Sequence, residues 1–209
     1  MKETIYSIPI NESFAVVDGE CPVCRLHRKL IDDTLDYVLG SAMMEPDIRM
    51  RTNAMGFCAH HLAALAKRQK RLPLALILDT HLQTPVPIER ASAGCYVCHR
   101  VRGFLTAYYA NILYLWHKEA DFKRRFDAQP MICRPHTAGL ATAAKNELSK
   151  RELPEFLASL QTKTDRAVKA LTDSLAVFTR SFDHRHANEP LGEHRLAVER
   201  AVAYMSGVS

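Results

Sequence analysis

The stretch CPVC at residues 21–24 returns as CYVC at residues 95–98. After a long gap, each cysteine pair is followed by a C-x2-H pattern, as CAHH from residue 58 and as CRPH from residue 133. The four motif positions of the first copy recur 74 or 75 residues later, and together the two copies use all 6 cysteines. The pattern predicts an internal duplication of about 75 residues.

The residue types of each copy are typical of a structural zinc site. Three thiolates and one imidazole make a closed tetrahedral Cys3His set, in which the ion has no open coordination position. The sequence therefore predicts two zinc ions per chain. The predicted ligands are Cys21, Cys24, Cys58, His61, Cys95, Cys98, Cys133 and His136.

Other roles for the cysteines stay open at this point. Free cysteine is common in protein cores, so six buried thiols without a metal are one alternative. An iron–sulfur protein that transfers electrons or senses redox state is the alternative cofactor prediction, although the usual cluster motifs hold cysteines more closely spaced than one C-x2-C per copy. A thiol–disulfide role is disfavoured because no βαβ pattern surrounds the motifs.

Residues 95–99 also read CYVCH, which is the attachment motif of a c-type haem. The duplication argues against that interpretation, because the position of His99 is held by Arg25 in the first copy. His60 competes with His61 for the first site, but Pro135 stands at the place of His60 in the second copy. We therefore expect neither His60 nor His99 to be a ligand.

Two pairings of the half-sites are open. Each copy can close its own site, or Cys21 and Cys24 can complete a site with Cys133 and His136. Loop-closure entropy favours closure within a copy by less than about 1 kcal/mol. The segment 84–94, with two prolines and a glycine, favours two separately finished units. We therefore expect each copy to close its own site.

The rest of the chain predicts an all-α fold. Helical periodicity is strong after an N-terminal segment, ETIYSIPI and SFAVV, that could form a short β structure. Residues 153–185 form an amphipathic pattern of some 30 residues that predicts one long C-terminal helix. We expect two tandem metal-binding repeats, at 1–90 and 91–149, and C-terminal helices at 150–209 that pack on both.

Composition limits the function classes. The 209 residues are 47% hydrophobic with a net charge of +5, which is typical of a soluble globular protein. No segment resembles a secretory signal or a membrane span, so we expect a cytoplasmic protein with reduced thiols. Carboxylates interleave with its basic clusters, and this disfavours nucleic acid as a partner. Loop 181–194 gathers acidic residues and histidines but has no recognised metal motif.

Four ligands per ion leave no position for a substrate, so the sequence favours a non-catalytic interaction or regulatory module over an enzyme. The run from residue 21 to 62, the segment LPLALILDTHL and the ending SFDHRHANEPLG…AYMSG resemble a bacterial family of unknown function found mainly in anaerobes. The resemblance covers nearly the whole chain. It implies a stand-alone protein with this cysteine and histidine set, and it brings no known activity.

Overall fold

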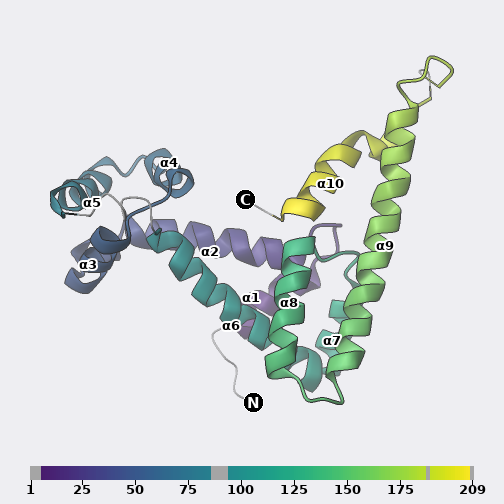
Figure 1. The fold of residues 1–209 in the computed structure, drawn as a ribbon, viewed down its shortest axis with the longest axis horizontal. Coiled ribbons are helices and arrows are strands. Elements are labelled where there is room, and N and C mark those ends of the chain that lie inside the picture. Colours follow the sequence, from purple (N-terminus) through teal and green to yellow (C-terminus); the bar gives the residue numbers. More distant parts are fainter. Residues whose placement is uncertain (1–5, 86–93, 187–188, 208–209) are drawn as a thin grey trace. The chain divides into compact units, whose positions relative to one another are not determined.

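The computed structural model describes residues 6–85, 94–186 and 189–207, and every regular element in these ranges is a helix (Figure 1). The 3-10 helices are η1 (Ser41–Met44) and η3 (Gly192–Leu196). The α-helices are α1 (Ser7–Ala15), α2 (Pro22–Val38), α3 (Pro46–Met55), α4 (Ala59–Lys67), α5 (Arg71–Gln83), α6 (Tyr96–Lys118), α7 (Ala120–Ala128), α8 (Arg134–Glu147), α9 (Leu153–Arg180) and α10 (Ala197–Ser206). None of these helices has both the length and the apolar character needed to cross a membrane.

The all-α prediction is confirmed, but the N-terminal β segment is not found in the described residues. Residues from Ser7 to Ala15 form helix α1, and residues 3–5 of the predicted strand lie outside the described ranges. Ile10 and Phe14 are both fully buried. Their spacing of one helical turn places them on one face, so burial of that face outweighs the β propensity of the segment.

Helix boundaries follow the proline and glycine signals of the sequence. Pro46 stands in the first turn of α3, and Gly56 ends that helix with φ of 61° while its N–H donates to the carbonyl of Thr52. The positive φ explains the glycine, because other residues avoid that conformation. The long C-terminal pattern forms the 28-residue helix α9. Residues 86–93 of the predicted linker lie outside the described residues.

The chain divides into two compact units. The first unit takes residues 1–28 and 106–209, and the second takes residues 29–105. The boundary falls inside α2 and inside α6, so each of these long helices contributes to both units. The sequence-based division at residues 90 and 149 follows the repeats and stays a prediction.

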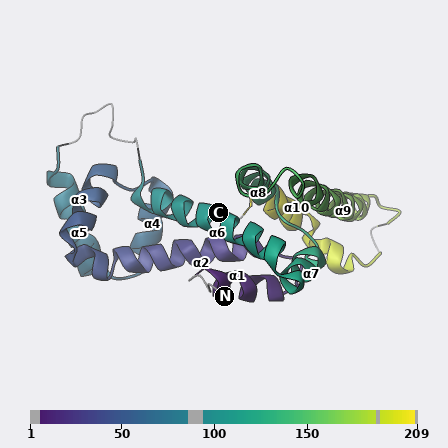
Figure 2. The same ribbon diagram turned by 90° about the horizontal axis from the view of Figure 1, so that it is seen from below.

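An aromatic cluster forms the core of the first unit. The ring of Phe14 lies 5.1 Å from that of Phe122 and 5.8 Å from that of Phe126. Phe156, on α9, lies 5.6 Å from Phe126 and 5.1 Å from Trp116. These contacts join α1, α6, α7 and α9, while α8 packs beside α9, as Figures 1 and 2 show. The cluster fixes the framework on which the start of α8 is held.

Short helices build the second unit around the end of α2 and the start of α6. Helices α3 and α5 pack side by side, and Leu65 of α4 and Ile77 of α5 are buried. The guanidinium of Arg100 lies 4.3 Å from the ring centre of Tyr37 and 5.0 Å from that of Phe104. This cation–π contact ties the start of α6 to the end of α2.

Two glycines inside helices test the packing of α8. A Cβ on Gly139 would lie 2.5 Å from the ring of Tyr109, whereas a Cβ on Gly103 would meet nothing within 4 Å. Gly139→Ala should therefore lower the free energy of unfolding by about 1–3 kcal/mol through overpacking. Gly103→Ala, the matched control, should raise it by about 0.5–1 kcal/mol through helix propensity. Thermal melting followed by circular dichroism measures both, and equal gains would contradict the close packing of Tyr109.

Candidate metal centres

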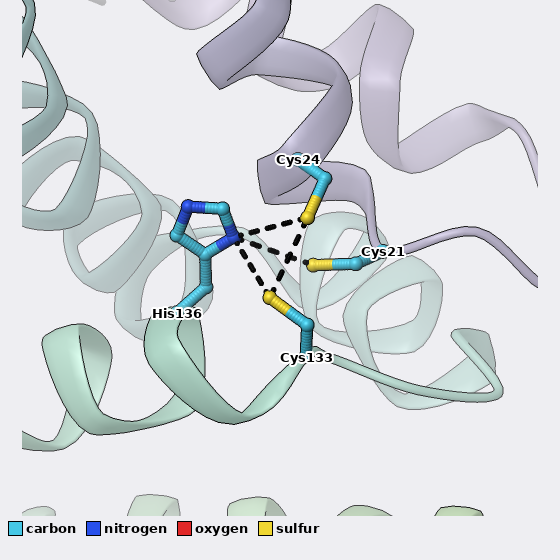
Figure 3. Close-up of side chains that lie close together, drawn as sticks. All are labelled: Cys21, Cys24, Cys133 and His136. Atoms are coloured by element: carbon cyan, nitrogen blue, oxygen red, sulfur yellow. Dashed lines mark hydrogen bonds between the residues drawn. The ribbon is translucent and has the colours of Figure 1, made fainter. Parts of the chain in front are cut away.

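The first candidate centre, here called the α2–α8 site, lies entirely in the first unit and joins the first turns of those two helices. It consists of Cys21, Cys24, Cys133 and His136, all buried. The Nδ1 atom of His136 lies 3.7, 3.3 and 3.1 Å from the sulfurs of Cys21, Cys24 and Cys133. Figure 3 shows the four side chains pointing toward one another, two from each helix start.

The second candidate centre, the α4–α6 site, has the same composition and lies entirely in the second unit. It consists of Cys58, His61, Cys95 and Cys98. The Nδ1 atom of His61 lies 3.2, 3.5 and 3.3 Å from the sulfurs of Cys58, Cys95 and Cys98. The backbone N–H of Tyr96 donates to the carbonyl of Gly56 over 3.0 Å, which holds the start of α6 beside Cys58.

All four half-sites are the first turn of an α-helix. The carbonyls of Cys21, Cys58, Cys95 and Cys133 each accept a hydrogen bond from the backbone N–H four residues later. Each of these cysteines therefore precedes its helix, and the second ligand stands three residues on, on the same face. Both cysteine pairs therefore begin long helices, α2 and α6.

The expected pairing of half-sites was wrong. Cys21 and Cys24 of the first copy meet Cys133 and His136 of the second, and the other two half-sites meet in the same crossed way. The cause is the length of α2, whose 17 residues carry the chain about 25 Å from its start. The 10 residues of α3 then span only about 15 Å, which does not return Cys58 to the start of α2.

The thiols of Cys21 and Cys133 in the α2–α8 site do not ionise alike. Burial raises the pKa of the Cys21 thiol, but hydrogen bonds with Cys133, Cys24 and His136 outweigh burial and leave the pKa lowered. Hydrogen bonds to Cys21 and Cys24, together with burial, raise the pKa of Cys133. The Cys21 thiolate is thus stabilised by a neighbour, Cys133, that stays protonated. A nearby cation would favour the thiolate form of both residues.

The α4–α6 site has the same imbalance. Burial and the neighbouring Cys95 and Cys58 raise the pKa of Cys98 to about 12. The pKa of Cys58 is lowered, because hydrogen bonds that include the backbone N–H groups of His61 and His60 outweigh the opposing effect of burial. Burial, with a contribution from His60, lowers the pKa of His61. A neutral imidazole is the form that binds a metal ion.

The distances in both sites fit one tetrahedral ion. Zinc bonds of about 2.3 Å to sulfur and about 2.0–2.1 Å to nitrogen place tetrahedral ligands about 3.6–3.8 Å apart. The sulfurs of Cys24 and Cys133 are 3.4 Å apart, and those of Cys58 and Cys98 are 4.0 Å apart. Within each group, all four ligand atoms lie within 4.8 Å of one another. Each donor set can therefore surround a single ion.

Other residues singled out in the sequence lie outside these groups. His60 and His99 have exposed side chains, and neither belongs to the two groups. In loop 181–194, His186 Nδ1 lies 2.8 Å from a carboxylate oxygen of Glu189, and His194 Nδ1 lies 3.0 Å from the hydroxyl of Ser174. Within the described ranges, the two cysteine–histidine groups are the ones that could hold a metal ion.

Carboxylates pair with the basic side chains that follow the first cysteine motif. Arg25 contacts Asp18 at 2.9 Å, and Arg28 contacts Glu20. Similar pairs in the second unit join Lys29 to Asp33, Arg68 to Asp32 and Lys70 to Asp36. These ion pairs offset the positive charge that an anionic partner would require.

A cavity of about 390 Å³ opens beside the α2–α8 site. Cys21 and Cys24 line it, together with Met131 and residues of α9 and α10 such as Leu171 and Ala203. A small chelator or thiol reagent can therefore approach this site from the side of the cysteine pair.

Comparison with known proteins places the chain in one family. The model of a family of unknown function, DUF6062, matches twice, over residues 1–87 and 83–209. The two matches together span the chain and agree with the internal duplication. No curated protein and no solved structure matches it.

The crossed pairing predicts which double variants lose both ions. Cys21→Ser with Cys133→Ser damages one site and should leave one ion per chain. Cys21→Ser with Cys58→Ser damages both sites and should leave none. The measurement is metal per chain by mass spectrometry of the purified protein. The reverse outcome, one ion in the second variant and none in the first, would establish closure within each copy.

Proposed function

The chain belongs to DUF6062, a family of unknown function, so we propose a function from its own residues: it binds two zinc ions that serve as structural ties between its two repeats. The observation that carries the proposal is the gathering of three cysteine sulfurs and one imidazole nitrogen twice over, within 4.8 Å in each group. In this proposal the eight gathered residues are the ligands. In this proposal the two ions stabilise the fold of the protein. The protein itself acts as a non-catalytic interaction or regulatory module.

The spacing of the donors supports a single ion over a cluster. In an iron–sulfur cluster the ligands bind different irons, so their sulfurs surround several atoms and lie farther apart than ligands of one ion. Sulfur–nitrogen distances of 3.1 to 3.7 Å around His136 are those of ligands that share one ion. Three thiolates with one imidazole suit zinc, which accepts tetrahedral sulfur and nitrogen ligands.

A structural role follows from the closed donor set. With four protein ligands, zinc has no position for water or substrate, so it contributes folding free energy instead of Lewis-acid chemistry. The free energy of structural zinc binding is on the order of 10 kcal/mol, comparable with the whole stability of a domain. Since each site joins half-sites of different repeats, the ions stabilise the contact between repeats as well as each helix start.

The interaction role and the cellular setting belong to the same proposal. Val198, Val202 and Met205 follow one face of α10 and are 42%, 58% and 61% exposed, which supports contact with another apolar surface. The six cysteines are free thiols in the metal-free chain. Zinc thiolates persist where thiols stay reduced, and this supports a cytoplasmic location.

Metal content tests the proposal directly. The full chain, purified without added metal, should contain two zinc ions and be colourless, because zinc has no visible absorption. Elemental mass spectrometry and an absorption spectrum measure this. His61→Ala and His136→Ala should each lower the content toward one ion, whereas His60→Ala and His99→Ala should leave two. A brown protein that contains iron and acid-labile sulfide would overturn the zinc assignment in favour of a cluster.

Removal of the ions tests their structural role. Excess chelator under reducing conditions should lower the melting temperature by more than 10 °C, since a loss of several kcal/mol moves a domain of this size by about 2–4 °C per kcal/mol. Added zinc should restore the original melting temperature. Circular dichroism follows both steps. Unchanged melting after complete removal of the metal would show that the ions are not structural.

A further inference from the structure

A second histidine contacts the imidazole of the α2–α8 site. The Nδ1 atom of His27 lies 3.2 Å from the Nε2 atom of His136, on the side of the ring away from the sulfurs. The two ring centres are 5.4 Å apart. His27 follows Cys24 by three residues on α2, so Cys21, Cys24 and His27 stand on one helix face in consecutive turns.

The contact specifies a tautomer of His136. Its Nδ1 atom faces the three sulfurs and would hold the ion, so a neutral ring carries its proton on Nε2. That N–H points at His27 Nδ1, which then accepts the hydrogen bond and leaves the proton of His27 on its own Nε2. A metal-bound imidazole is typically oriented by such a second hydrogen bond.

Among the described residues, the equivalent imidazole of the α4–α6 site has no such partner. In the part of the chain that the structure describes, the Nε2 atom of His61 is buried and has no hydrogen bond. The position of His27 in the second copy is held by Val101, which is 4% exposed and offers no acceptor on its side chain. The two sites therefore have the same four residue types. They differ in whether the Nε2 atom of the histidine has a hydrogen-bond partner.

Burial adds to the difference. All four ligands of the α2–α8 site are buried, whereas Cys58 and Cys98 of the other site are partly exposed. A Cβ on Gly207 would lie 3.6 Å from the sulfur of Cys133, so the residue that ends α10 packs on that thiol. Among the described residues, α9 and α10 follow the second repeat, and the first repeat has no counterpart of α10.

We propose that His27 is a positioning residue that holds His136 as an Nδ1 ligand, and that the α2–α8 site consequently binds its ion more tightly than the α4–α6 site. The inference rests on the proposed function, since it requires that both sites bind a metal ion. It adds a residue outside the ligand set and an order of affinity between two sites that have identical ligands.

Affinity is measured one site at a time in the full chain. Cys58→Ser with Cys95→Ser leaves the α2–α8 site, and Cys21→Ser with Cys133→Ser leaves the α4–α6 site. Equilibrium competition for zinc against a chromogenic chelator gives each dissociation constant. At equilibrium the result does not depend on how fast a chelator reaches the ion through the cavity beside Cys21. The α2–α8 site should bind zinc at least tenfold more tightly.

Variants at position 27 separate its hydrogen bond from its bulk. His27→Ala should weaken zinc binding to the α2–α8 site by about 10–100-fold, the usual effect of losing such a partner. His27→Asn, whose side-chain oxygen stands at the place of Nδ1 and can accept the same hydrogen bond, should recover most of the loss. The same His27→Ala change should leave the α4–α6 site unaltered. His99→Ala, which removes an exposed histidine from α6, is the matched control and should change neither site.

A spectroscopic measurement on the otherwise unaltered chain covers the case in which a double cysteine variant does not fold. Nitrogen NMR of the zinc-loaded protein should show His136 bound through Nδ1, with a proton on Nε2 that exchanges slowly with water. In His27→Leu, which keeps bulk at position 27 but has no acceptor, that proton should exchange faster, which a purely packing role for His27 would not cause.

The outcomes distinguish failure of the proposed zinc binding from failure of the proposal about His27. A chain that binds no metal overturns the proposed function and this inference with it. A chain that binds two ions but whose α2–α8 affinity is unchanged by His27→Ala, or whose His136 binds through Nε2, overturns the inference alone. Equal affinities of the two sites in the original chain would do the same.

Discussion

The fold depends on a contact that is unfavourable without a charged group at its centre: the meeting of two helix N-termini. Each start carries unsatisfied backbone N–H groups and the positive end of a helix dipole. At both sites two such ends face each other around three cysteines and one histidine. Three thiolates around a divalent cation carry a net charge of about −1, which suits the two positive ends. With the proposed ion bound, the donor set would stabilise the contact between helix starts.

The sequence predicted the members of this contact but not their partners. Spacing and duplication identified all eight gathered residues, because a cysteine before a helix and a ligand three residues later always share a face. The pairing depends on how far α2 carries the chain, and on whether a short or a long helix follows it. Entropy did not decide the question. Cys24 and Cys133 are 109 residues apart, and a loop threefold longer costs only about 1 kcal/mol.

The N-terminal helix shows a second limit of sequence reasoning. The apolar and β-branched residues around Ile10 fit a strand by propensity. The sequence of this segment alone does not show which distant residues will pack against it. In the structure Phe14 fills a space between Phe122 and Phe126, and the Nε2 amide of the buried Gln129 donates to the carbonyl of Phe14 over 2.9 Å. The partners lie more than a hundred residues away. Only tertiary contacts of this kind decide between helix and strand there.

Crossed pairing gives the duplication a consequence that closure within each copy would not have. If each repeat closed its own site, each could fold alone. The two repeats would then be independent units. Here each repeat supplies half of each site, so neither completes a donor set without the other. The two sites are then free to diverge in their surroundings while the ligands stay fixed. Where one site has His27 and Tyr109 nearby, the positions 74 residues away hold Val101 and Leu35, both buried and apolar. If both sites bind an ion as proposed, divergence of this kind would let two sites with the same four ligands differ in affinity.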